Sequence, residues 1–410
     1  MLFTFVVLFL TLGCDLAYGQ GEEGNEKEEV TVTLNFSQKG AFGLKKNSNN
    51  NKGESTDVTF KVQDLSVSLR GMICYHEGEN TYLRLDGYVY DQGQINISVP
   101  KNDAIKNISI TAKKDEYSKF TVSYMHNQQE RSNKFDKKNP KEPIQVNGID
   151  SDHIILTPQK NEKLYLIQIT LTITRPKLDA TLDEKGENVE STISGIAGAN
   201  KTLALNRTFN PSQLYTMCLP FDLSKDMITE IFGNETKVFL YDGYQNGELS
   251  FSTVKEGVLN AGMPFLMRSE YYVEQPTFAG VTVESTTAQT VGGGEWDLCG
   301  TFGSLELVAD GTQLFLTAGG TLAKPLADSR KMRGFRCYLK KAAGTVNGSA
   351  QLPSVTIDGE TNAIKTAEYA APTSGTTAYS LSGMKLNAGC KTANGGIMII
   401  DGKKFITTNR

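Results

Sequence analysis

Apolar and polar residues alternate along much of the chain, and this spacing predicts β-strands. Residues 30–34 have the sequence VTVTL, in which every second residue is apolar. The same alternation recurs in residues 58–69 and 164–173. A period of two places successive side chains on opposite faces of a strand, so that one face can be buried. Short runs of this kind, separated by polar loops, predict a β-sandwich of the jelly-roll type over residues 30–176.

Residues 203–266 are the most patterned part of the sequence, and they predict a mainly β module with one short helix. Ser224 precedes an apolar run and Gly233 follows it. A serine before such a run and a glycine after it are typical of a helix N-cap and a helix end. Around this helix, apolar strands are separated by the turn-forming pairs Asp-Gly at 242–243 and Asn-Gly at 246–247.

Charged and low-complexity segments divide these patterned regions, so we expect an all-β protein of several units. Residues 21–29 are acidic, 177–188 are charged and aperiodic, and 351–377 are rich in Thr, Ala, Ser and Gly. An Asp-Gly pair at 401–402, between two apolar runs, predicts a terminal β-hairpin. The predicted organisation is a signal peptide at 1–19, an acidic linker at 20–29, a β-sandwich (jelly-roll-like) domain at 30–176, a linker at 177–188, a mainly β module at 189–350, a linker at 351–377 and a C-terminal hairpin tail at 378–410.

The N-terminal segment predicts export. Residues 1–12 are almost wholly apolar, too short to span a membrane and typical of the apolar region of a signal peptide. Residues 17–19, Ala-Tyr-Gly, form a small-x-small cleavage site that would leave Gln20 as the first residue. Two other interpretations stay open, with Cys14 as a lipid-anchor cysteine or with a buried N-terminal strand. Cleavage and lipid anchoring both predict a secreted or cell-surface protein, on the outer-membrane or periplasmic side, that meets the membrane only through one of these two devices.

Several short motifs of the central module resemble those of a known group of proteins. They are Leu205-Asn206-Arg207, Cys218-Leu219-Pro220-Phe221, Phe232-Gly233, Ala261-Gly262-Met263-Pro264-Phe265, Cys299-Gly300-Thr301-Phe302 and Gly334-Phe335-Arg336-Cys337-Tyr338. Through these motifs, residues 189–346 are similar to a module common in exported multidomain proteins of Bacteroides and Prevotella species. Such modules usually lack an assigned activity, so the resemblance implies an exported protein and no particular chemistry.

Two further segments carry resemblances. Residues 94–100 and 105–111 are similar to strands of a galactose-binding-like jelly roll in exported Bacteroidetes proteins. Residues 378–406 resemble the C-terminal tails of such proteins, some of which are similar to sorting signals for type IX secretion. Met398 stands where those tails usually have an aromatic residue, so a small hairpin packed on the preceding domain is the alternative.

No recognisable catalytic constellation is present in the sequence. The histidines His76, His126 and His153 lack metal-binding spacing, although His153 lies beside Asp150 and Asp152. The chain has no G-x-S-x-G, P-loop or dinucleotide-binding glycine motif, and sequence alone cannot place two carboxylates at a glycosidase spacing. With a net charge of −4 over 410 residues, nucleic acid is not an expected partner. We therefore expect no catalytic residue, no metal site and no cofactor.

The cysteines stand at positions 14, 74, 218, 299, 337 and 390. In an exported protein they can form disulfides, and Cys299 with Cys218 or Cys337 is the first pair to consider. The central cysteines lie in apolar runs without close spacing, which favours small buried side chains instead.

A tyrosine-rich strand supplies the candidate ligand-binding residues. Alternation along this strand would put its aromatic and charged side chains on one face. These candidates are Tyr82, Arg84, Asp86, Tyr88 and Tyr90. Tyrosine rings can stack on a ligand, and charged side chains can form bidentate hydrogen bonds with it; an ordinary solvent-facing strand is the alternative. Trp296, the only tryptophan, is either a stacking surface or part of the core.

These observations favour an exported cell-envelope protein with a non-catalytic interaction role, in particular carbohydrate binding. Its partner would be a glycan or another envelope protein. Two alternatives remain open, a secreted enzyme that degrades polysaccharide or protein, and a structural or adhesin spacer. An enzyme would show convergent carboxylates or histidines in a cleft, and a lectin-like module would show exposed tyrosines in a shallow groove. A spacer would show neither.

Overall fold

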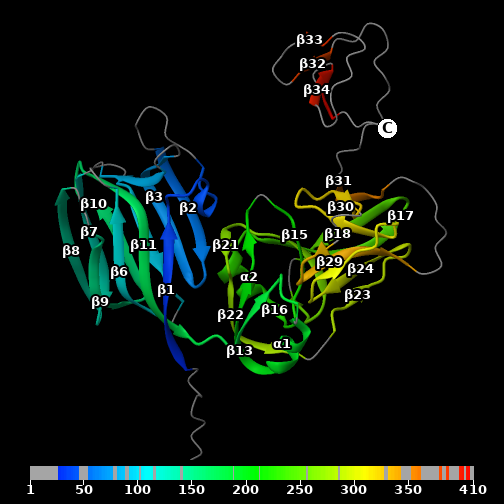
Figure 1. The fold of residues 1–410 in the computed structure, drawn as a ribbon, viewed down its shortest axis with the longest axis horizontal. Helices are drawn as coiled ribbons and strands as arrows, with labels where there is room; N and C mark the ends of the chain where they lie inside the picture. The colour runs from blue at the N-terminus through cyan, green and yellow to red at the C-terminus, as the bar shows by residue number, and fades with distance from the viewer. Residues whose placement is uncertain are drawn as a thin grey trace, which may run out of the picture.

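The computed structural model describes the fold of most of the chain after residue 25 (Figure 1). The described residues are 26–45, 54–76, 81–87, 92–100, 103–113, 117–138, 142–187, 189–211, 213–254, 257–284, 287–326, 331–342, 352–361, 378–380, 385–386, 397–400 and 403–406. The predicted signal peptide, Cys14 and Cys390 lie outside these residues.

The N-terminal unit is a β-sandwich around one apolar core, which confirms the fold class predicted from the alternation. Its strands follow the order β8-β7-β10-β5-β3-β4-β11-β6-β9, with β2 added to β3 and β1 to β11. The elements are β1 (Lys27–Asn35), the 3-10 turn η1 (Ala41–Gly43), β2 (Glu54–Val62), β3 (Leu65–His76), β4 (Tyr82–Asp86), β5 (Gln94–Ser98), β6 (Ala104–Ala112), β7 (Tyr117–His126), β8 (Gln129–Lys138), β9 (Ile144–Ser151), β10 (His153–Pro158) and β11 (Lys163–Pro176).

The strand β11 illustrates how this sequence makes a sandwich. Its inward side chains alternate with outward ones and are fully buried: Leu164, Leu166, Ile169, Leu171 and Ile173. Burying each such side chain contributes about 1.5–3 kcal/mol. The strand β11 pairs with β4, β6 and β1, so it links β4 to β6 in the strand order. The partner strand β1 begins at Lys27, so residues 27–29 of the predicted acidic linker belong to the sheet.

The central module is mainly β, with small sheets around two apolar clusters. Its elements are β12 (Ala180–Asp183), α1 (Val189–Gly195), β13 (Gly198–Asn206), β14 (Thr208–Phe209), β15 (Tyr215–Cys218), β16 (Leu223–Ser224), α2 (Lys225–Phe232), β17 (Lys237–Gln245), β18 (Glu248–Thr253), β19 (Val258–Leu259), β20 (Pro264–Arg268), β21 (Tyr272–Glu274), β22 (Thr277–Val283), β23 (Thr290–Val291), β24 (Trp296–Thr301), β25 (Leu305–Glu306), β26 (Gln313–Leu316), β27 (Leu322–Ala323), β28 (Lys331–Met332), β29 (Arg336–Lys341), β30 (Ser354–Ile357) and β31 (Glu360–Thr361).

The predicted helix is α2, and its ends form as the sequence pattern indicates. The Ser224 side chain accepts a hydrogen bond from the Met227 backbone N–H at 3.2 Å, and Gly233 follows the helix with φ of 107°. The Asn-Gly pair at 246–247 is the turn between β17 and β18. The Asp-Gly pair at 242–243 is not a turn, because it lies within β17 at a break in the register with β18. An extra residue at such a bulge bends a strand without ending it.

Two segments predicted to be linkers contain paired strands. Within 177–188, β12 runs parallel to β13, with Leu182 opposite Leu205. Within 351–377, β30 runs parallel to β18 and buries Val355 and Ile357. Both segments look polar overall, but Leu182, Val355 and Ile357 are buried where a neighbouring strand supplies hydrogen bonds.

The C-terminal hairpin prediction is confirmed at the level of the backbone. The strands β34 (Ile397–Ile400) and β35 (Lys403–Ile406) are antiparallel, with Ile400 opposite Lys403. They belong to a larger sheet than the hairpin alone, because β32 (Ala378–Ser380) pairs with β34 and with β33 (Lys385–Leu386).

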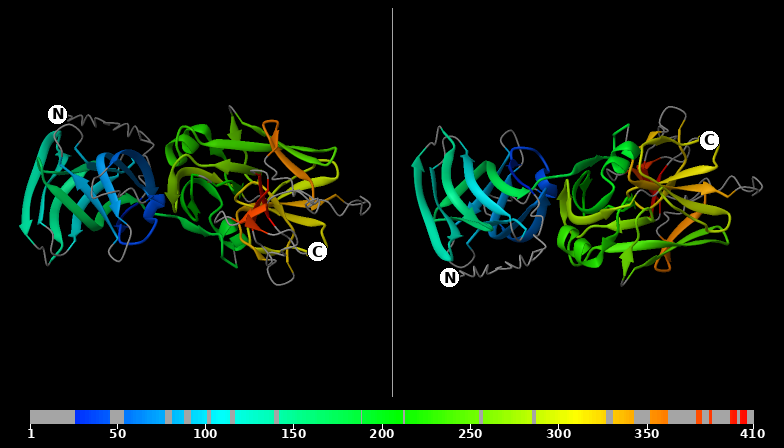
Figure 2. Two further views of the ribbon diagram at one scale, coloured as in Figure 1. Left: turned by 90° about the horizontal axis from the view of Figure 1, so that it is seen from above. Right: turned by 90° about the horizontal axis from the view of Figure 1, so that it is seen from below.

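The sandwich and the central module lie side by side and share a strand pairing (Figure 2). The strand β21 runs parallel to the end of β2, with Phe60 opposite Tyr272 and Val62 opposite Glu274. Beside this pairing, Phe42 stacks on Phe60 and meets Tyr272 edge-on. In the part of the chain that the structure describes, no helix is long and apolar enough to cross a membrane.

Candidate ligand-binding surface

The strand β4 follows the alternation predicted for it. Its two leucines are fully buried in the sandwich core, whereas Arg84 is paired across the sheet with Tyr165 on β11. Directly opposed residues in antiparallel strands have side chains on the same face of the sheet. Tyr82 and Asp86, two residues away on either side of Arg84, therefore share the face that is turned away from the core.

Arg84 and Asp86 are buried against each other on this face. Arg84 Nη2 donates to Asp86 Oδ2 at 2.9 Å, and the side chains are only 5% and 1% exposed. Although burial opposes the charged form, the Asp86 carboxylate holds the pKa of Arg84 above its usual value. This differs from the sequence prediction, in which both side chains contact the ligand. Their charges satisfy each other, so the pair fixes the end of β4 beneath the surface.

Two aromatic rings, from β3 and β11, lie against Tyr82. The His76 ring stacks on Tyr82 with centroids 4.9 Å apart, and the Tyr165 ring meets Tyr82 at 5.7 Å and 60°. Lys113 Nζ lies 4.7 Å from the centroid of Tyr82 and 5.8 Å from that of Tyr165. We call these four residues, which are all half-buried, the Tyr82 cluster.

The Tyr82 cluster has the chemistry of a surface that recognises polar rings. Tyrosine presents a large apolar face together with a hydroxyl, so it can contact both the C–H and the O–H groups of a ligand. A lysine ammonium donates up to three hydrogen bonds, and Lys113 stands over both tyrosine rings. Tyr165 and Lys113 are not among the residues predicted from sequence. Tyr165 reaches Tyr82 only through the pairing of β4 with β11, and Lys113 only through the pairing of β6 with β11.

Of the other aromatic candidates, only Trp296 has a described position. Tyr88 and Tyr90 lie outside the described residues. Trp296 is 5% exposed and packs in the core of the central module, so it has no face to offer a ligand.

The histidine and acidic residues singled out in the sequence do not form a metal site. His153 Nδ1 lies 2.6 Å from Asp152 Oδ1, whereas Asp150 pairs with Lys106 at 2.5 Å. That hydrogen bond to Lys106 lowers the pKa of Asp150. Among the residues with described positions, no group of three or more His, Cys, Asp or Glu side chains is arranged to hold a metal ion.

The cysteines with described positions are buried: Cys74, Cys218, Cys299 and Cys337. This agrees with the interpretation of these residues as small apolar side chains. Burial raises the pKa of Cys337 to about 12, so its thiol stays protonated at neutral pH.

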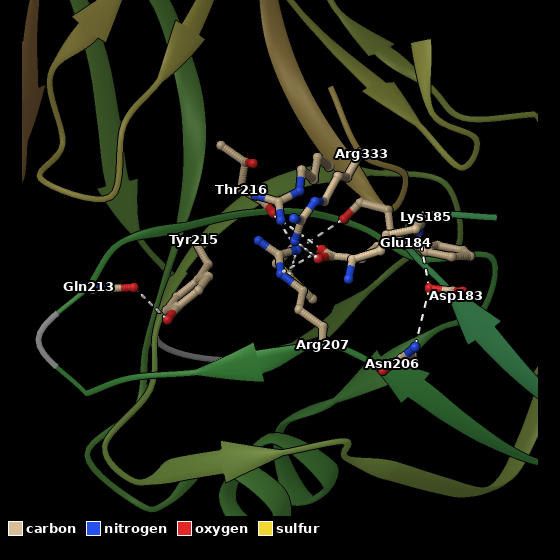
Figure 3. A network of polar contacts seen from close by, with 12 residues as sticks. Asp183, Glu184, Lys185, Asn206, Arg207, Gln213, Tyr215, Thr216 and Arg333 are labelled. Carbon is tan, nitrogen blue, oxygen red and sulfur yellow. Dashed lines mark hydrogen bonds and ion pairs between the residues drawn. The ribbon is translucent and has the colours of Figure 1, made fainter. Parts of the chain in front are cut away.

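A buried charge network in the central module involves two arginines of the resemblance motifs. Arg207 and Arg333 converge on the carboxylate of Glu184, as Figure 3 shows, and Arg336 also contacts it. The hydrogen bonds from Arg333 Nη1 and Arg336 Nη2 to Glu184 measure 2.7 and 2.6 Å. Arg207 Nε lies farther away, at 3.6 Å from Glu184 Oε2. We call these four residues the Glu184 network.

Arg207 is held in place by more than its charge. Its Nη1 donates to the backbone carbonyls of Thr216 at 3.0 Å and Phe335 at 3.3 Å, and its guanidinium lies 5.2 Å from the ring centroid of Tyr215. Burial, with the positive charge of Arg336 nearby, lowers the pKa of Arg207 to about 9. It therefore remains charged at neutral pH. The network joins the segment after β12 to β29, so its role is to hold the module together.

Comparison with known proteins adds no family assignment. No family model matches the chain, and no curated protein matches it. Solved structures similar to it include the family 32 carbohydrate-binding module from C. perfringens NanJ in complex with galactose, at 12% identity over 28% of this chain and 99% of that one, with a TM-score of 0.21. A family 29 carbohydrate-binding module matches at 8% identity over 35% of this chain and 92% of that one, also with a TM-score of 0.21. A family two carbohydrate esterase from Cellvibrio japonicus matches at 14% identity, covers 42% of this chain and 45% of that one, and has the same TM-score of 0.21. These low scores carry no weight for function, which we argue from the chain's own residues.

Proposed function

We propose that this is an exported, non-catalytic protein of the cell envelope that binds carbohydrate on the Tyr82 cluster. The observation that carries the proposal is the convergence of two tyrosines and a histidine from three strands, with a lysine that directly follows β6, on one face of the sandwich. A sugar ring has apolar C–H faces and a rim of hydroxyls, and this set of side chains complements both.

The support beneath the cluster favours a preformed site. The buried pair of Arg84 and Asp86 fixes the same strand that carries Tyr82, and Tyr82 is itself paired with His76 on β3. A surface whose side chains are already ordered loses less conformational entropy when a ligand binds. Strands also position binding residues more rigidly than loops do.

The proposal of export rests on the sequence. The apolar residues 1–12 and the cleavage-like residues 17–19 are typical of a signal peptide. The resemblance of residues 189–346 to exported Bacteroides and Prevotella modules agrees with this location. In this setting the ligand would be an extracellular glycan or a glycan carried by another envelope protein.

A glycan array tests the binding site. The full chain should bind a defined set of glycans, and Tyr82→Ala should weaken that binding at least about tenfold, or about 1.4 kcal/mol. Tyr82→Phe keeps the ring and should keep most of the affinity, so it is the matched control. Circular dichroism should show that both variants are folded.

Three results would argue against this function. Binding to no glycan would leave the spacer interpretation in its place. Equal binding by Tyr82→Ala and Tyr82→Phe would move the site away from the Tyr82 cluster. Release of shorter sugars from a bound polysaccharide would favour the enzyme alternative over a binding protein.

A further inference from the structure

A cavity of about 170 Å³ lies where the sandwich meets the central module. One wall comes from the sandwich, at the turn between β2 and β3 and at the end of β11, and the other comes from α2, β13 and β22. Its charged lining residues are Lys61, Asp64, Asp103, Arg175 and Glu230. The parallel pairing of β2 with β21 joins the two walls, and the Gln63 N–H donates to the Glu274 carbonyl across it at 2.8 Å.

Most charges around the cavity are already paired. Arg175 Nη1 contacts Asp64 at 2.7 Å, and its Nε contacts Glu28 at 3.1 Å. Lys61 Nζ donates to the backbone carbonyl of Glu230. These contacts use the two cations of the lining. Of its three carboxylates, Asp64 is paired and Glu230 is exposed to solvent, which leaves one buried carboxylate.

Asp103 is that remaining carboxylate. The residue is 8% exposed and lines the cavity. Its backbone N–H donates to the Pro100 carbonyl, but its side chain accepts no hydrogen bond from any residue whose position the structure describes. A buried carboxylate is expensive unless a cation or several hydrogen bonds compensate it. The Asp103 carboxylate therefore lines the cavity without a compensating partner among the described residues.

We propose that this cavity binds a compact organic ammonium, with the Asp103 carboxylate as its counter-ion. A cavity of this size has the volume of about five or six liquid waters, at about 30 Å³ each, so it exceeds what a single ion fills. Ile231 and Ala279 give the lining apolar area for the carbon skeleton of such a ligand. An ammonium offers both the positive charge and the hydrogen-bond donors that Asp103 lacks, whereas a neutral polyol offers donors without the charge.

The electrostatics around Asp103 agree with this assignment. Burial, together with the negative charge of Asp64, raises the pKa of the Asp103 carboxyl to about 7, and Lys27 and Arg175 oppose this shift. A bound cation would favour the ionised carboxylate. Ligand binding should therefore release a proton near neutral pH and strengthen as the pH rises.

Calorimetric titration of the full chain with cyclohexylammonium and cyclohexanol tests the proposal. The two probes have similar shapes and differ in charge. We expect cyclohexylammonium to bind about tenfold more tightly at pH 8 than at pH 6, because the ionised fraction of a group with a pKa of about 7 rises by that factor. Cyclohexanol should bind more weakly and without this pH dependence. Asp103→Asn should abolish ammonium binding, and Asp57→Asn, a change of an exposed carboxylate on β2, should leave it unchanged.

Several outcomes would overturn the proposal. They are no ammonium binding at pH 8, equal binding by Asp103→Asn, and equal affinity for the two probes. If Asp103→Asn does not fold, the test is proton release when the wild-type protein binds cyclohexylammonium. This release is measured by titration in two buffers of different ionisation enthalpy, and zero release contradicts the proposal. Tyr82→Ala should retain ammonium binding, so this result is independent of the glycan site.

Discussion

Replacing Glu184 by glutamine leaves three guanidinium groups around a neutral side chain. The Glu184 side chain is 6% exposed, and Arg207 beside it is 2% exposed. Removing one partner of a buried ion pair usually costs about 3–5 kcal/mol, because the other charge stays buried without compensation. Arg333 is 53% exposed and can turn to water, so its share of the loss is small. We therefore expect a loss of about 3 kcal/mol in the free energy of unfolding of the central module.

Trp296 provides the assay. It is the only tryptophan of the chain, and it lies on β24, which pairs with the strand β29 that carries Arg336. Its fluorescence during urea unfolding reports on the central module. For a urea dependence of about 1–3 kcal/mol/M, a loss of about 3 kcal/mol lowers the unfolding midpoint by about 1–3 M. The change is large enough to measure without ambiguity.

Two further variants isolate the cause. Glu187→Gln removes the same charge from an exposed residue of the same segment and should change the stability by less than about 0.5 kcal/mol. Adding Arg207→Met to Glu184→Gln should restore part of the loss, because it removes the uncompensated buried cation. If Glu184→Gln is no more damaging than Glu187→Gln, the network contributes little and the reasoning from burial is wrong.

Two other predictions follow from single positions. Asp103 has a pKa raised by burial to about 7 in the fold, against about 4 in an unfolded chain, so its contribution to stability is fully present below about pH 4 and is lost as the pH rises through 7. Urea unfolding should show that the free energy of unfolding of the wild-type protein falls by roughly 2–3 kcal/mol relative to that of Asp103→Asn between pH 5 and pH 8. A stability difference between the two proteins that stays constant with pH would contradict this. At Gly334 an added Cβ would lie 2.2 Å from the Phe302 carbonyl oxygen, so Gly334→Ala should cost about 1–3 kcal/mol by Trp296 fluorescence. Gly303→Ala, where a Cβ meets nothing within 4 Å, should be neutral, and equal effects of the two changes would refute the steric argument.

Many strands and the helix α2 were predictable because their signals are local, whereas the short helix α1 was not predicted. Alternation over a few residues shows which side chains of β11 can be buried together, and no distant residue alters that pattern. The same holds for α2. The serine before the helix accepts a hydrogen bond from a backbone N–H of the first turn, and the backbone N–H of the glycine after it donates to a carbonyl of the last turn. The cysteines in apolar runs were also predictable as buried side chains.

The candidate sites depend on contacts between residues far apart in the sequence. Alternation placed Tyr82, Arg84 and Asp86 on one face, but only the packed sandwich shows that the two charged residues are buried together and that Tyr165 joins Tyr82. Local patterns contain no information on which strands become neighbours, because pairing is set by how several strands bury their apolar faces at once.

Glu184 and Asp103 show the same limit for charged residues. Glu184 lies in a segment whose composition is typical of a solvated linker, and Arg333 and Arg336, far along the chain, turn it into a buried counter-ion. Asp103 sits in a polar loop of the sequence, and its burial follows from the way the sandwich packs against α2 and β22. The sequence alone accounts for the elements and their buried faces, since those depend on neighbouring residues. The tertiary structure determines which charges lose water and which partners they meet, since desolvation depends on everything packed around a group.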